Sequence, residues 1–243
     1  MPTHTEPTFA IQRAGERASF DFGWLKTYHS FSFGEYVDPA NLNWGALRVF
    51  NDDTVAPGEG FPTHPHRDME IVTYVLRGEL EHRDSLGHHG IVSPGGIQYV
   101  SAGTGVRHSE FNHSPTDGVH FVQMWVLPRE RGGSPGYGQH EFAPSERRDR
   151  WLAVASGEAG VAAPVTLRQD ATVRVARLEG AALRYDAAPG RFGFLFVAEG
   201  SVRANGAQLE TGDAVRMHGV RELEVTGNAE LVLWDVPPMV GAA

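Results

Sequence analysis

The stretch GFPTHPHRDMEIVTYVLRGELEHRDSLG, from Gly60 to Gly87, places His64 and His66 one residue apart, just before a run that alternates like a β-strand. Side chains of residues i and i+2 point to the same face of a strand. If that face is buried, two imidazole rings lose contact with water and need polar partners. A shared metal ion is one partner that would satisfy both rings.

The rest of the chain has the composition of a β-rich globular protein. Of its 243 residues, 41% are hydrophobic and 21% are charged, and glycine (29) and proline (15) are frequent. Short segments rich in Val, Ile, Tyr, Phe and Thr lie between turn residues, which is typical of an all-β barrel or sandwich. Residues 44–50, for example, predict a strand that ends at a turn-rich loop, NDDTVAPGEGF (51–61).

A weak internal repeat predicts two copies of one barrel. The segment FGFLFVAEGSVRANGAQLETGDAV (192–215) parallels IVTYVLRGELEHRDSLGHHGIVSPGG (71–96), with a period of roughly 120 residues. A stretch rich in Pro, Gly and charge separates the two copies. We therefore expect two jelly-roll β-barrel domains, residues 1–130 and 151–243, joined by a linker at 131–150.

Charge and cysteine content exclude several classes of protein. The formal net charge of −9 disfavours nonspecific nucleic-acid binding, which needs basic patches. The absence of cysteine excludes disulfides, thiolate metal sites and cysteine nucleophiles. Since no apolar segment has the length of a signal peptide core or a membrane span, we expect a cytoplasmic protein without membrane contact. A chain of two closed barrels is expected to be a monomer.

A second pair of candidate ligands, His108 and Glu110 in GTGVRHSEFNHS, has the same one-residue gap. Two such pairs on neighbouring strands would bring three imidazoles and a carboxylate to one point. These ligands suit iron, zinc, manganese, nickel or copper. We therefore predict one divalent transition metal per chain, with iron as the first choice. The structural alternative is that Glu110 forms a salt bridge with Arg107 or Arg67.

The other histidines are unevenly distributed along the chain. Ten of the twelve precede residue 128, and the second copy has no histidine at the position that matches His64 and His66. Only the first copy is therefore expected to hold metal. His82 lies in a polar strand and is expected to be exposed.

Three longer stretches carry a family resemblance. GWLKTYHSFSFGEY (Gly23–Tyr36), RVFNDDTVAPGEGFPTHPHRDMEIVTYVL (Arg48–Leu76) and SAGTGVRHSEFN (Ser101–Asn112) together resemble the pirin family of the cupin superfamily, in its bacterial quercetin 2,3-dioxygenase-like branch. The resemblance covers residues 15–128 closely and the remainder more loosely, as the C-terminal cupin of the family. It implies a bicupin whose second domain lacks metal ligands.

The resemblance also implies roles for individual residues. His64, His66 and His108 would be metal ligands. In many cupins the carboxylate ligand comes from the first motif, which here would be Glu70. In pirins it is the glutamate two residues after the third histidine, and the resemblance places it here at Glu110. Strand parity leaves both open, and the longer pirin-like match favours Glu110. Glu70 would then support the site by holding an imidazole N–H.

The same resemblance suggests a substrate pocket. His29 lies in a family-like segment and would line the pocket with Phe31 and Phe33, although a satisfied core or loop histidine is the alternative.

The implied activity is that of a quercetin 2,3-dioxygenase. A flavonol would bind the metal through its 3-hydroxyl and 4-carbonyl oxygens, Glu110 would accept the hydroxyl proton as a general base, and reaction with O2 would release carbon monoxide. The family also includes transcriptional cofactors, so the alternative is a metal- or redox-responsive regulator that binds a protein partner without turnover. A cupin acting on another small molecule is a third possibility.

Overall fold

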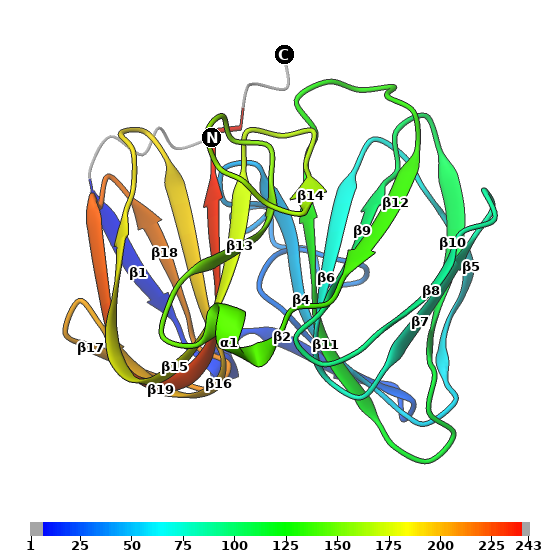
Figure 1. Cartoon of the computed structure of the whole chain (residues 1–243), viewed down its shortest axis with the longest axis horizontal. Helices are drawn as coiled ribbons and strands as arrows, with labels where there is room; N and C mark the ends of the chain where they lie inside the picture. Colours follow the sequence, from blue (N-terminus) through cyan, green and yellow to red (C-terminus); the bar gives the residue numbers. More distant parts are fainter. Residues whose placement is uncertain (1–6, 240–243) are drawn as a thin grey trace.

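The computed structural model describes residues 7–239 and shows two β-rich units side by side (Figure 1). Regular structure is almost entirely β-strand, apart from one 3-10 turn at Ala14–Glu16 and the short helix α1 at Pro144–Arg147. The first unit packs a seven-stranded sheet against a four-stranded sheet, and the second is built on an eight-stranded sheet. The prediction of an all-β fold with two jelly-roll units is confirmed, although the sheets do not close into complete barrels.

The first unit is formed by strands from the N-terminal half of the chain. Its seven-stranded sheet has the order β12 (Gly136–His140), β9 (Ile97–Ser101), β6 (Glu70–Arg77), β11 (Val119–Val126), β4 (Leu47–Val55), β3 (Leu25–His29), β2 (Ala18–Asp21). Its four-stranded sheet has the order β5 (Gly60–His66), β10 (Val106–Asn112), β7 (Leu80–Asp84), β8 (His89–Val92).

The second unit contains the C-terminal strands and one strand from the start of the chain. The order is β1 (Thr8–Gln12), β18 (Ala214–His218), β16 (Phe192–Ala204), β19 (Glu222–Val236), β15 (Thr172–Asp186), β13 (Leu152–Ser156), β14 (Val165–Thr166), with β17 (Ala207–Glu210) paired to β16. Because β1 pairs antiparallel with β18, the beginning of the chain is tied to the second unit.

Residues 131–150, predicted as a linker, contain β12 and α1. Strand β12 pairs with β9 and so forms the edge of the seven-stranded sheet. Its sequence GYGQH has no hydrophobic period, and the strand is held to the sheet by backbone hydrogen bonds. We keep the division into 1–130 and 151–243 as a proposal, with β1 exchanged onto the second sheet.

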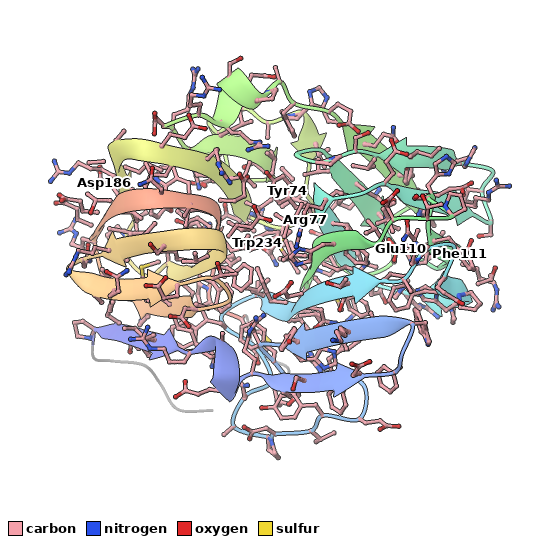
Figure 2. The ribbon with its side chains drawn as sticks, turned by 90° about the horizontal axis from the view of Figure 1, so that it is seen from below. Tyr74, Arg77, Glu110, Phe111, Asp186 and Trp234 are labelled. Carbon is pink, nitrogen blue, oxygen red and sulfur yellow. The ribbon has the colours of Figure 1, made fainter. Side chains whose placement is uncertain are left out.

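The two units share one hydrophobic core. The ring of Phe50 on β4 lies with its centroid 4.9 Å from that of Phe194 and 4.8 Å from that of Phe196, both on β16. The Trp234 indole N–H donates to the sulfur of Met124 at 2.8 Å. Figure 2 shows Tyr74 and Trp234 near the junction of the units, whereas Glu110 lies within the first unit. Each buried aromatic side chain contributes about 1.5–3 kcal/mol, so the junction holds β4 and its neighbours firmly.

The prediction of a loop at 51–61 is wrong over its first half, because strand β4 continues to Val55. Asn and Asp favour turns in isolation, but here they are paired across the sheet, with Asn51 opposite His29 and Asp53 opposite Thr27. Strand alternation places Phe50 in the shared core, and Asn51 and Asp53 on the other face, toward the interior of the first unit. Within residues 7–239, no helix is long and apolar enough to cross a membrane.

Candidate metal centre

Strands β5 and β10 bring three histidines together. They pair antiparallel with His64 opposite His108, and His66 shares the strand face of His64. The Nε2 atoms of His64 and His108 are 3.0 Å apart, and the ring centroid of His66 lies 4.8 Å from each of the other two. A ring nitrogen from each of the three lies within 4.8 Å of the others. The structure thus groups the three histidines that the sequence singles out.

The chemistry of this group suits a transition metal. Burial, followed by the charges of His108 and His64, lowers the pKa of His66 to about 4. Burial also lowers the pKa of His108. Neutral imidazoles have the free lone pair that a metal ion requires. Two nitrogens at right angles, each about 2.1 Å from an ion, would be about 3.0 Å apart. The separation of 3.0 Å between His64 and His108 is therefore already that of adjacent ligands.

Glu110 lies next to the histidines but is held by amides. Burial alone would raise its pKa, but His108 and the other imidazoles, together with the Gln123 hydrogen bond, lower it below its usual value. Gln98 Nε2 donates to Oε1 at 2.5 Å, and Gln123 Nε2 donates to Oε2 at 2.8 Å. A carboxylate oxygen of Glu110 lies within 4.8 Å of nitrogens of His82 and His108. The structure therefore places an ionised carboxylate beside the cluster.

The expectation that His82 is exposed is wrong. Its side chain is fully buried, and its Nδ1 lies 3.3 Å from Nδ1 of His108. On its other side, its Nε2 lies 3.4 Å from Oδ2 of Asp84, which also contacts Nδ1 of the exposed His88 at 2.8 Å. A continuous polar line therefore runs from the cluster to the surface. The buried Leu80 indicates this in the sequence, because it shares the strand face of His82.

Glu70 does not hold an imidazole, contrary to the expectation. Its carboxylate accepts hydrogen bonds from the Tyr99 hydroxyl, from Ser101 Oγ at 2.7 Å and from the backbone N–H of Arg168 at 2.9 Å. It therefore connects the two units. Counting even offsets from His66 fails because Asp68, at φ = 50°, interrupts the extended backbone between β5 and β6.

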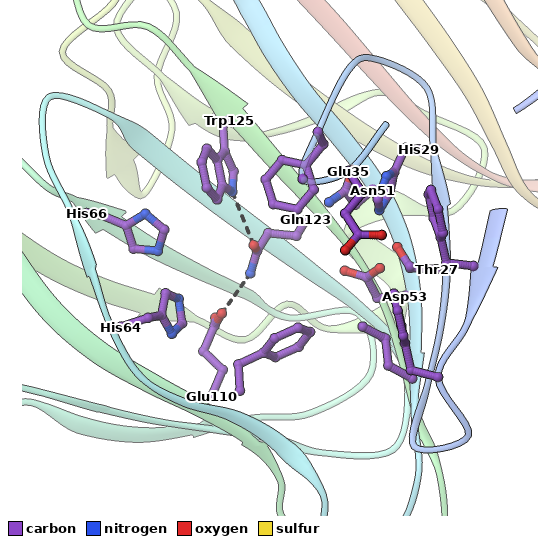
Figure 3. Close-up of a pocket in the computed structure, with 16 residues that line it drawn as sticks. Thr27, His29, Glu35, Asn51, Asp53, His64, His66, Glu110, Gln123 and Trp125 are labelled. Carbon is purple, nitrogen blue, oxygen red and sulfur yellow. Dashed lines mark hydrogen bonds between the residues drawn. The ribbon is translucent and has the colours of Figure 1, made fainter. Parts of the chain in front are cut away.

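A cavity of about 320 Å³ adjoins the cluster. This volume is at the lower end of the roughly 300–1,000 Å³ of small-ligand pockets. His64, His66 and Glu110 form part of its wall (Figure 3). Its aromatic lining consists of Phe20, Phe22, Phe33, Phe61 and Trp125. The arrangement is suited to a flat, largely apolar ligand that reaches the histidines with a polar edge.

Two of the three predicted pocket residues line this cavity. His29 and Phe33 do, with ring centroids 5.2 Å apart. Phe31 does not, because its fully buried ring packs in the shared core, 5.5 Å from Phe194. The family resemblance that suggested Phe31 does not show this difference, because β3 ends at His29 and Phe31 lies beyond the regular strand.

Sequence reasoning missed five polar residues of the pocket: Thr27, Glu35, Asn51, Asp53 and Gln123. The signal was present in Asn51 and Asp53, which have the same i, i+2 spacing as His64 and His66. Gln123 accepts a hydrogen bond from Trp125 Nε1 at 3.1 Å, which directs its amide N–H toward Glu110 (Figure 3).

Comparison with known proteins agrees with this geometry. The family model described as Pirin matches residues 11–126, and the one described as Quercetinase C-terminal cupin domain matches residues 153–236. A Mycobacterium tuberculosis protein named "Putative quercetin 2,3-dioxygenase" is 45% identical, over 96% of this chain and 97% of its own length. An Escherichia coli K12 protein named "Quercetin 2,3-dioxygenase" is 37% identical, over 94% of this chain and 99% of its own.

A solved structure is also similar over nearly the whole chain. The crystal structure of the bacterial pirin YhhW from Escherichia coli in complex with nickel(II) gives a TM-score of 0.88 at 37% identity, covering 96% of this chain and 100% of that one.

Proposed function

Because this chain belongs to the pirin family, with a pirin unit followed by a quercetinase-type C-terminal cupin, we propose that it is a metal-dependent dioxygenase that cleaves a flavonol with O2 and releases carbon monoxide. The observation that carries the proposal is the cluster of three histidines, two of which, His64 and His66, lie in the wall of an aromatic cavity. The relatives named as quercetin 2,3-dioxygenases support it.

The proposed metal ligands are His64, His66 and His108, with Glu110 as the fourth. Nitrogen and oxygen ligands accept iron, nickel, manganese, copper or zinc. Iron is the first metal to test, and nickel the second because of the nickel complex of YhhW. When bound, the metal would act as a Lewis acid that lowers the pKa of a coordinated hydroxyl.

The pocket residues would bind and orient the substrate. The rings of Phe33 and Trp125 meet edge to face with their centroids 5.2 Å apart, and His66 meets Trp125 in the same way at 4.9 Å. Such walls contact a flat aromatic ligand over a large area and keep water from it. The flavonol edge that carries the 3-hydroxyl and 4-carbonyl would face the histidines.

Glu110 would accept the proton of the 3-hydroxyl. Its lowered pKa keeps it ionised, as a proton acceptor must be. Oε2 is the atom for this role, because its partner Gln123 lines the cavity while Gln98, the partner of Oε1, does not. The hydrogen bond from Trp125 to Gln123 fixes the amide and thereby the position of the carboxylate.

The test is an anaerobic titration of metal-loaded protein with quercetin, followed by addition of oxygen. A spectral shift on binding and carbon monoxide in step with quercetin consumed are expected. The same metal concentration without protein is the control for spontaneous oxidation. Binding without carbon monoxide would contradict the dioxygenase proposal, and metal content without quercetin binding would favour a regulator or another substrate.

A further inference from the structure

A second polar group faces the histidines across the cavity. It comprises Thr27 and His29 on β3 and Asn51 and Asp53 on β4, which are cross-strand neighbours in the pairs Thr27–Asp53 and His29–Asn51. All four line the cavity, and Figure 3 shows them on the side opposite His64 and His66. None of these four residues is a proposed metal ligand or the proposed proton acceptor, so the proposed function gives them no role.

These side chains are buried and incompletely paired. Their exposed fractions are 3% for Thr27, 6% for His29, 3% for Asn51 and 4% for Asp53. Within residues 7–239, Thr27 Oγ1, His29 Nδ1, Asn51 Oδ1 and Asp53 Oδ1 are buried without a hydrogen-bond partner. Thr27 nevertheless lies close enough to Asp53 to oppose the rise in its pKa. Buried polar atoms in native proteins nearly always have partners. Several unpaired atoms in one pocket wall therefore indicate a partner that enters the pocket.

The charges around this group define the partner. Among the residues that the structure describes, Asp53, Glu35 and Glu110 line the cavity, and no lysine or arginine does. A carboxylate or phosphate is therefore disfavoured beside Asp53 and Glu35, at the end of the cavity away from the histidines (Figure 3). Asn51 Oδ1 accepts hydrogen bonds and requires a donor, whereas the Asp53 carboxyl accepts when ionised and donates when protonated. A hydroxyl group, which both donates and accepts, therefore fits this pair. Burial, together with the nearby Asp52 and Glu110, raises the pKa of Asp53 to about 7, as expected for a carboxyl in an anionic, water-poor site.

We propose that Asn51 and Asp53, assisted by Thr27 and His29, form a second subsite that binds a phenolic hydroxyl on the substrate ring farthest from the metal. The inference rests on the proposed function, because it takes the other edge of the flavonol to lie at the histidines. It defines the substrate class as neutral aromatics hydroxylated at both ends.

The test measures binding without turnover, under nitrogen, on metal-loaded protein. Two ligands are compared: quercetin, and 3-hydroxyflavone, which keeps the metal-binding oxygens but lacks the other hydroxyls. Calorimetry gives the Kd, and quenching of Trp125, which lines the cavity, gives a second signal. The variants are Asp53→Leu and Asp53→Asn. Thr54→Val, at the next and exposed position of the same strand, is the matched control.

In Asp53→Leu, the Kd for quercetin is expected to rise about tenfold or more, while that for 3-hydroxyflavone stays within about twofold. Asp53→Asn keeps a hydrogen-bond acceptor in a side chain of the same size, so its Kd for quercetin is expected to lie between those of Asp53→Leu and the wild type. Thermal melts establish that each variant is folded.

Three results would overturn the inference. An equal loss for both ligands would mean that Asp53 only shapes the pocket. An unchanged Kd for quercetin would remove the subsite and leave the dioxygenase proposal intact. Failure of both flavonols to bind the wild-type protein would overturn the proposed function and the subsite together.

Discussion

Replacing His82 with leucine is expected to weaken metal binding although no proposed ligand is removed. His82 is the buried partner of His108, 3.3 Å away through the two Nδ1 atoms, and so orients that ring and sets which nitrogen carries its proton. In the leucine variant, Nδ1 of His108 stays buried but has lost its partner. Leaving a buried polar atom unpaired costs about 1–3 kcal/mol of free energy. The same range corresponds to about a 10- to 100-fold loss of metal affinity, the usual effect of removing such a partner.

The assay is competition for the metal with a chelator of known affinity. His82→Leu is expected to raise the metal Kd about 10- to 100-fold, and His82→Asn, which keeps a polar atom, less. His88→Ala is the matched control, because His88 contacts Asp84 from the exposed side and does not touch His108. A metal Kd unchanged in His82→Leu would refute the reasoning. An equal loss in His88→Ala would show that the effect does not pass through the contact with His108.

Three further predictions address the proton acceptor, the second subsite and the strand pairing. Glu110→Gln is expected to lower carbon monoxide release about 10²- to 10⁴-fold, and full activity would contradict its role as base. The pKa of Asp53 is about 7 in the folded protein and ordinarily 3.8. Between these two pH values the folded state keeps a proton that the unfolded chain has lost, so the stability of the wild type should fall as pH rises from about 4 to about 7. Asparagine does not titrate, so in urea unfolding the free energy of unfolding of Asp53→Asn should decrease with pH by up to about 4 kcal/mol less than that of the wild type. If the two free energies differ by the same amount at every pH, this prediction is contradicted. Gly60→Ala would place a Cβ 2.3 Å from the carbonyl oxygen of Glu110 and should destabilise by about 1–3 kcal/mol in thermal melts, whereas Gly136→Ala, with open space, should not. Equal melting of the two glycine variants would contradict the close contact between β5 and β10.

Strand alternation predicted the parts of the molecule where the chain is regular. His64 and His66 share a face because they lie on one strand, and the pairing of β5 with β10 brings them to His108. The repeated pattern of short strands and turns predicted the two-unit all-β fold for the same local reason. The register between β5 and β10 is a long-range property that a single sequence does not contain.

The predictions that were wrong have two causes. Some assumed that a polar side chain is exposed to solvent, and others counted along the chain past the point where a regular strand ends. His82, Asn51 and Asp53 are polar but buried, because they point into the first unit: Asn51 and Asp53 lie at the cavity wall, and His82 lies against His108. Phe31 and Glu70 lie beyond a strand end and beyond the kink at Asp68, so offsets counted along the chain lose their meaning there. The exchange of β1 onto the second sheet depends on contacts about 200 residues apart, which local pattern cannot show.

The most direct test of the account is the metal content of untagged protein, measured by mass spectrometry for the wild type and for His64→Ala, His66→Ala and His108→Ala. His89→Ala is the control, because that ring is half exposed and contacts Glu81 rather than the cluster. The account predicts about one transition-metal ion per chain in the wild type and in His89→Ala, and most of it lost in each of the other three. Full metal content in His108→Ala would contradict the claim that these three imidazoles hold the ion.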